Sequence, residues 1–256
     1  MSNLFDLSGK RAVVTGASSG LGVQMAKALA EHGADLALLA RRKDKLEEVK
    51  SQIEQEYSRK VVSIECDVSS LDQVQRAVGV VKEELGGADI LINNAGVGGI
   101  GEASQMSLEE WQKVIDVNLT GVFITAQQLG KLMIEQNYGK IINIASIFGH
   151  SANLAFPVVA YHATKGAVVN LTRALAAEWA KNKITVNAIG PGFFESEMTM
   201  SIKDNQEANA FIVGSNPMHR WGKEGELNGA LILLASDASS FITGQTIYVD
   251  GGWTAV

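Results

Sequence analysis

Tyr161 and Lys165 are the residues of this sequence whose types and spacing most directly suggest chemistry. They lie four positions apart in the segment YHATK, and residues at that spacing share one face of a helix. A phenol keeps its proton up to about pH 10, and a neighbouring ammonium group favours the phenolate. Lowering the phenol pKa by roughly three units would require about 4 kcal/mol of differential interaction. A tyrosine shifted in this way can exchange a proton near neutral pH.

Two further polar residues fall where they could join this pair. The segment 139–146 is predicted to be a strand that ends at Ser146, which places a hydroxyl group close to the start of the helix carrying Tyr161. Asn118 falls inside one long helix predicted for 107–137. Asparagine is a poor helix former, so its presence there indicates a bend or a functional amide.

A glycine-rich segment near the start of the chain indicates nucleotide binding. The strand predicted for 11–15 runs directly into GASSGLG, and a helix follows that ends near Gly33. Gly16, Gly20 and Gly22 allow a tight turn and close approach of a ligand, and the helix start offers unpaired N–H groups to an anion. Its place between strand and helix favours dinucleotide binding over the alternative, a purely structural turn.

Strand and helix patterns alternate along the remaining chain. Further strands are predicted at 35–40, 61–68, 88–96 and 139–146, with a sixth within 182–192 and a last one at 245–252. This alternation predicts a single α/β domain over residues 1–256, a Rossmann-type doubly wound parallel sheet with helices on both faces. Ligands in such sheets bind at the carboxyl ends of the strands.

The end of the second predicted strand bears on cofactor choice. Arg41 and Arg42 follow this strand directly, whereas Asp35 lies at its opposite end. Guanidinium groups match a ribose 2′-phosphate, so the sequence favours NADP(H) over NAD(H); the alternative is a solvated basic helix start. Asp67, just beyond the third strand, could accept an adenine amino hydrogen.

Composition excludes several classes of protein. Lys and Arg total 22 against 28 for Asp and Glu, a net charge of −6 with no long basic run, which argues against nucleic acid as a partner. One cysteine, Cys66, suits a reducing compartment. The four histidines show no metal-ligand spacing, so no metal is expected. Without a signal peptide or membrane-spanning segment, the protein is expected to be cytoplasmic.

Taken together, the motifs resemble the short-chain dehydrogenase/reductase family. TGASSGLG, NNAG, DVNLTG, NIAS, YHATK and NAIGPG occur in family order over essentially the whole chain. The resemblance implies that Ser146 hydrogen-bonds the substrate oxygen and that Tyr161 exchanges a proton with it. Lys165 would lower the tyrosine pKa and bind the nicotinamide ribose, while Asn118 would hold a water that continues the proton path. The implied cofactor-binding residues are Gly16, Ser18, Ser19, Gly20, Leu21, Gly22, Arg41, Arg42, Asp67, Val68, Asn94, Ala95, Gly96, Tyr161, Lys165, Pro191, Gly192, Phe194 and Ser196.

The same resemblance implies a substrate class and an assembly. The segments PGFFESEMT and TIYVDGGWTAV are most similar to gluconate 5-dehydrogenase-like enzymes acting on sugar acids or polyols. A 3-oxoacyl-[acyl-carrier-protein] reductase is an alternative, and so is a hydroxysteroid dehydrogenase, since Phe148, Phe156, Phe193 and Met198 could line an apolar pocket. A catalytically silent NADPH-binding regulatory protein is the alternative from another class. Residues 193–222 would close over the substrate, and a homotetramer is expected.

Overall fold

The computed structural model describes residues 4–152, 156–196 and 199–256. In these residues seven parallel strands form one sheet in the order β3-β2-β1-β4-β5-β6-β7. The strands are β1 (Arg11–Thr15), β2 (Asp35–Ala40), β3 (Val61–Glu65), β4 (Ile90–Asn93), β5 (Gly139–Ile144), β6 (Ile184–Pro191) and β7 (Thr246–Val249). The predicted doubly wound sheet is therefore confirmed. Strand order reverses between β1 and β4, which opens a crevice at their carboxyl ends.

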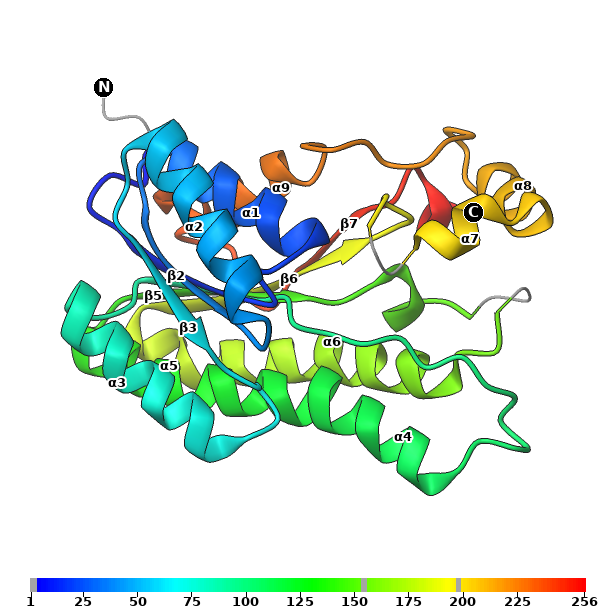
Figure 1. The fold of residues 1–256 in the computed structure, drawn as a ribbon, viewed down its shortest axis with the longest axis horizontal. Helices are drawn as coiled ribbons and strands as arrows, with labels where there is room; N and C mark the ends of the chain where they lie inside the picture. The colour runs from blue at the N-terminus through cyan, green and yellow to red at the C-terminus, as the bar shows by residue number, and fades with distance from the viewer. Residues whose placement is uncertain (1–3, 153–155, 197–198) are drawn as a thin grey trace.

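Helices cover both faces of this sheet. They are α1 (Gly20–Glu31), α2 (Lys43–Tyr57), α3 (Leu71–Leu85), α4 (Leu108–Ile115), α5 (Gly121–Gln136), α6 (Val159–Trp179), α7 (Met200–Asp204), α8 (Gln206–Ser215) and α9 (Asn228–Ala235). Figure 1 shows α1, α2 and α9 above the sheet and α3, α5 and α6 below it. The short helices α7 and α8 lie together near the C-terminus, at the far end of the molecule from the N-terminus.

The strands are buried on both faces, which explains their nearly continuous apolar sequences. Val14 of β1 pairs with Leu38 of β2 and with Ile92 of β4, and all three side chains are fully buried. One apolar cluster fills the space between the sheet and α1, α2 and α9. A second fills the space between the opposite face and α3, α5 and α6. The carboxyl ends of the strands are thus held at one fixed edge.

The long helix predicted for 107–137 is interrupted. Ser107 and Glu110 form the expected capping box at the start of α4. A five-residue π-helical turn, Asp116–Thr120, then separates α4 from α5 and contains Asn118. Such turns insert an extra residue into a helix and occur frequently at functional sites. The poor helix former in the sequence therefore marks a local change of helix geometry.

Candidate active site

A cavity of about 580 Å³ lies at the carboxyl edge of the sheet. It is lined by almost all of the residues predicted to bind the cofactor: Gly16, Ser18, Ser19, Gly20, Leu21, Arg41, Arg42, Asp67, Val68, Asn94, Ala95, Gly96, Tyr161, Lys165, Pro191, Gly192, Phe194 and Ser196. Ser146 also lines this cavity. Residues from seven separate parts of the chain are therefore gathered into one site.

Gly22 is the predicted cofactor residue that falls outside the cavity wall. A Cβ atom at this position would lie 2.2 Å from the carbonyl oxygen of Gly16 and 2.7 Å from Nδ2 of Asn94. Gly22 thus allows α1 to pack directly against the turn that follows β1. Gly16 itself has a φ of +67°, and a Cβ there would lie 2.8 Å from Cα of Ala95. The turn keeps its shape because neither position carries a side chain.

Arg42 connects the second strand to the glycine-rich turn. Its guanidinium group donates to Oγ of Ser19 at 2.7 Å and to Oγ of Ser18 at 3.3 Å. Arg41 lies at the same mouth of the cavity. Burial acts to raise the pKa of the Asp67 carboxyl, but hydrogen bonds from Ser69 and the charge of Arg41 lower it overall. This end of the cavity therefore combines two guanidinium groups and two hydroxyl groups with one ionised carboxylate.

Tyr161 and Lys165 both project from α6 into the other end of the cavity, as their spacing predicted. The ammonium nitrogen of Lys165 lies 5.4 Å from the centre of the Tyr161 ring and donates to the carbonyl oxygen of Ile144 at 2.7 Å. Burial lowers the pKa of Lys165 to about 8. Ser146 follows β5, and its Oγ accepts from the backbone N–H of Phe148.

The expectation of a lowered tyrosine pKa is not met in this structure. Burial raises the pKa of Tyr161, and interaction with the Ser146 side chain acts in the opposite direction without outweighing it. The physical reason is that the cavity walls remove water from the phenol, while Lys165 directs its ammonium group to Ile144. In the protein alone, Tyr161 is a neutral phenol that can donate a proton.

Asn118 lies behind the cavity wall. Its side chain is fully buried; the amide oxygen accepts from the backbone N–H of Val97, and the amide nitrogen donates to the carbonyl oxygen of Val97, each at 2.8 Å. The π-helical turn directs this side chain toward the loop after β4. Asn118 thereby holds the segment next to Gly96. A Cβ atom at Gly96 would lie 3.4 Å from Oδ1 of Asn118 and 3.9 Å from the Lys165 ammonium nitrogen.

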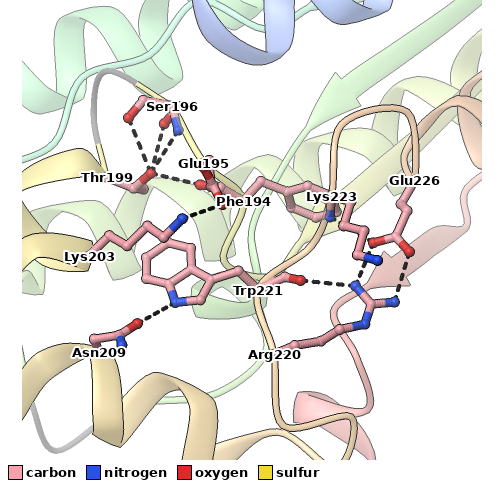
Figure 2. Close-up of polar contacts among 10 residues, drawn as sticks. All are labelled: Phe194, Glu195, Ser196, Thr199, Lys203, Asn209, Arg220, Trp221, Lys223 and Glu226. Carbon is pink, nitrogen blue, oxygen red and sulfur yellow. Dashed lines mark hydrogen bonds and ion pairs between the residues drawn. The ribbon is translucent and has the colours of Figure 1, made fainter.

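About half of the described residues in the segment predicted to close over the substrate are helical. It contains α7 and α8, and Figure 2 shows the polar contacts that fix it. The Thr199 hydroxyl donates to the carbonyl oxygen of Phe194 at 2.7 Å, and Trp221 donates to Asn209 at 2.7 Å. Arg220 forms two 2.7 Å contacts with Glu226. The segment is therefore tied to the cavity wall through Phe194 and, at its other end, to Glu226 just before α9.

A group of aromatic rings lies next to Tyr161. The ring centre of Phe193 lies 5.9 Å from that of Phe148 and 6.1 Å from that of Phe156, and Phe148 in turn contacts Tyr161 edge to face. Phe193 also contacts Trp253 near the C-terminus. The predicted aromatic group is therefore brought together, while Met198 lies outside the described residues.

Sequence reasoning missed several residues of the cavity wall. They are Ala40, Cys66, Val97, Val117, Ile144, Ala145 and Thr199. Most present small or apolar groups, which carry no recognisable signal in a single sequence. Thr199 is different, because a hydroxyl residue three positions after Ser196 is a typical local hydrogen-bonding pattern.

Other types of site are not found in the described part of the chain. No group of three or more His, Cys, Asp or Glu residues among the described positions could hold a metal ion. None of the helices in residues 4–152, 156–196 and 199–256 combines the length and apolar character needed to cross a bilayer.

The fold and the site together define a class of protein. A doubly wound parallel sheet, a glycine-rich turn at its crevice and a Ser, Tyr and Lys group in the same cavity are the features of a nicotinamide-dependent oxidoreductase. A family model described as "Enoyl-(Acyl carrier protein) reductase" matches residues 16–254. The chain belongs to the short-chain dehydrogenase/reductase family, as its motifs indicated.

Individual relatives cover the chain from end to end. Gluconate 5-dehydrogenase of Gluconobacter oxydans is 40% identical over 253 residues, covering 98% of this chain and 97% of the relative. A 2-dehydro-3-deoxy-D-gluconate 5-dehydrogenase of Formosa agariphila is also 40% identical, covering 98% and 94%. The crystal structure of a gluconate 5-dehydrogenase from Burkholderia cenocepacia, in complex with NADP and tartrate, is 37% identical with a TM-score of 0.95, covering 99% and 98%. These relatives do not favour the acyl-carrier, steroid or regulatory alternatives.

Proposed function

We propose that this protein is an NADPH-dependent oxidoreductase that interconverts a ketone and a secondary alcohol on a sugar acid of the gluconate type. The observation that carries this proposal is the single cavity that joins Ser146, Tyr161 and Lys165 to the glycine-rich turn and Arg42. Relatives named for gluconate and a deoxygluconate, at 40% identity, support the substrate class.

The residues of the cavity fit a dinucleotide phosphate. The glycine-rich turn lines the cavity where α1 begins, so the N–H groups of the helix start would receive a pyrophosphate, and Arg41 and Arg42 offer guanidinium groups to a 2′-phosphate. Asp67 and Val68 would contact the adenine, and Asn94 to Gly96 the central part of the cofactor. Pro191, Gly192, Phe194 and Ser196 would hold the nicotinamide end, with the ribose bound by Tyr161 and Lys165. NADPH bound in this way supplies the hydride.

The chain's own side chains would manage the substrate oxygen. During reduction negative charge develops on this oxygen, and donors fixed in advance stabilise it. Ser146 donates a hydrogen bond to the oxygen, and the neutral Tyr161 phenol transfers its proton to it. The Lys165 ammonium favours the phenolate that results, because opposite charges stabilise each other in a site from which water is excluded. Asn118 fixes the loop at Val97 and would hold a water that leads the proton to solvent.

We extend the proposal to the assembly and location of the protein. A homotetramer in which α5 and α6 face a second copy is supported by exposed apolar residues on these helices. Phe123 and Ile134 of α5 and Val159 of α6 are 42%, 38% and 39% exposed. A cytoplasmic location suits the single buried thiol. Light scattering coupled to size exclusion tests the assembly, and a monomer would refute it.

The activity is tested by NADPH oxidation with a panel of ketones. The panel contains 5-ketogluconate, a 2,5-didehydro-3-deoxy sugar acid, an acetoacetyl thioester and a keto steroid, each also assayed with NADH. Turnover of the sugar acids alone, with NADPH preferred, is the expected result. Turnover of the thioester or steroid alone would overturn the substrate class, and equal use of NADH would overturn the cofactor preference.

A further inference from the structure

A network of buried polar side chains runs between one face of the sheet and helices α5 and α6. Asn93 of β4 donates to Oδ1 of Asn143 on β5 at 2.9 Å, and Asn143 donates to the hydroxyl oxygen of Thr172 on α6 at 2.9 Å. The Thr125 hydroxyl of α5 contacts the amide oxygen of Asn93 from the other side. All four side chains are at most 2% exposed. Four elements of the fold are thus joined through side chains alone.

This polar network lies between two apolar clusters. Leu91 and Ile141, two positions before Asn93 and Asn143, belong to the cluster packed on α3, α5 and α6. Ala145, two positions after Asn143, belongs to a separate small cluster with Val168. Apolar side chains would fill this layer without the cost of desolvating amides. A fully bonded polar layer instead restricts the elements to one alignment, because any shift would leave buried donors unpaired.

The polar network fixes the position of α6 along β5. Asn143 directly precedes Ile144, whose carbonyl oxygen accepts from Lys165. Thr172 lies seven residues after Lys165, two helical turns along the same face. At the other end, a Cβ at Gly149 would lie 2.7 Å from the carbonyl oxygen of Lys165, so the helix backbone rests directly on that glycine. Sliding of α6 would break the bond between Asn143 and Thr172 and that between Lys165 and Ile144 together.

We propose that Asn143 and Thr172 are positioning residues that set the register of α6, so that Tyr161 and Lys165 face Ser146. Neither Asn143 nor Thr172 lines the cavity among the described residues. They act through Lys165 and Tyr161 and do not touch substrate. This inference rests on the proposed function, because the register matters to turnover through those two residues.

Thr172→Val tests this inference, since valine keeps the shape of threonine and removes the hydroxyl. The expected kcat is at least about tenfold lower, because small misplacements of reacting groups cost that much or more. The dissociation constant for NADPH should rise by a much smaller factor than kcat falls, because Tyr161 and Lys165 would contact only the ribose, whereas the glycine-rich turn and Arg42 lie on other elements. The alkaline limb of the kcat/KM profile should move to higher pH, as the pKa of a less enclosed Lys165 returns toward its ordinary value. Thr172→Ser, which keeps the hydroxyl, should restore all three properties.

The matched control is Thr185→Val on β6. The Thr185 hydroxyl is buried and makes no hydrogen bond to any described residue, so its loss should leave kcat unchanged. Unchanged kcat in Thr172→Val, or equal loss of kcat and NADPH binding without a shift of the pH profile, would overturn the inference.

Hydrogen exchange provides a readout that does not depend on turnover. Peptides covering 144–150 and 159–170 should exchange faster in Thr172→Val than in wild type, whereas peptides covering 11–31 should not. Uniform acceleration throughout the chain, or none, would overturn the positioning role. If the wild type reduces no ketone of the panel, the proposed function fails while this exchange pattern still decides the inference.

Discussion

The ammonium group of Lys165 donates to the carbonyl oxygen of Ile144 at 2.7 Å, within a cavity that lowers its pKa to about 8. The dipole of the Ile144 carbonyl group partly compensates for the lost hydration of the Lys165 ammonium group. This end of the cavity therefore contains an ammonium group whose burial destabilises the folded protein.

Lys165→Met should make the protein more stable and inactive. Up to pH 8 the lysine is charged in both folded and unfolded chains, so its full desolvation cost is present, and removal should raise the free energy of unfolding by about 1–3 kcal/mol. Between pH 8 and 10.5 the unfolded chain binds a proton that the folded chain has lost, so wild-type stability rises with pH. The excess in free energy of unfolding of Lys165→Met over the wild type should decrease between pH 8 and 10.5. Urea denaturation at pH 7, 9 and 10 measures it, with the exposed Lys113→Met as control. A less stable variant at pH 7 would contradict the prediction.

Tyr161→Phe should abolish turnover while NADPH still binds. The phenylalanine ring preserves the edge-to-face contact with Phe148 but has no proton to transfer. We expect kcat to fall by a factor of about 10² to 10⁴, the usual contribution of general acid catalysis. Tyr138→Phe is the control, because its hydroxyl contacts Asp237 away from the cavity. Turnover near the wild-type rate in Tyr161→Phe would refute the proposed acid.

Arg41→Ala combined with Arg42→Ala should reduce the preference for NADPH. A guanidinium pair contributes charge-assisted hydrogen bonds to a phosphate, so the dissociation constant for NADPH should rise by at least about tenfold. That for NADH should change by less than about threefold. Cofactor fluorescence titration measures both constants. Arg59→Ala is the control, since Arg59 donates to the carbonyl oxygen of Gly33. An equal effect on the two cofactors is the result that excludes a phosphate-binding role.

Gly22→Ala should destabilise the protein and weaken NADPH binding together. Its methyl group would meet the Gly16 carbonyl oxygen at 2.2 Å, which forces α1 away from the turn and costs about 1–3 kcal/mol. Gly79→Ala, on α3, is the matched control, because apart from its own helix backbone and chain neighbours no described atom lies within 4 Å of the added carbon. The control should gain about 0.5–1 kcal/mol from helix propensity. Thermal unfolding with and without NADPH distinguishes the two variants.

The sequence predicted the sheet well because its strands are short apolar runs separated by amphipathic helices. The predicted bounds 11–15 and 35–40 match β1 and β2. It did not predict the π-helical turn, which depends on the packing of Asn118 against Val97, a contact between residues 21 positions apart. The helices α7 and α8 were missed because their stabilising contacts, such as that of Asn209 in α8 with Trp221, are made with residues beyond the helices.

The site was predictable as a set of motifs but not as an environment. Residue types and order placed Ser146, Tyr161 and Lys165 in one cavity. The pKa of Tyr161 could not be predicted, because it depends on how completely the walls exclude water and on Lys165 turning to Ile144. Gly22 was assigned to the ligand although its close neighbour is Gly16. A spacing rule alone does not separate these two uses of glycine.

Cys66, in the cavity wall, should react slowly with thiol reagents. It is the single cysteine of the chain, its side chain is 1% exposed, and burial raises its pKa to about 11. Maleimides and disulfide-forming oxidants react with exposed thiolates, and at neutral pH this sulfur is neither exposed nor ionised. The wild-type chain can thus be stored without reducing agents, and a cysteine introduced on its surface would be the one site that accepts a label.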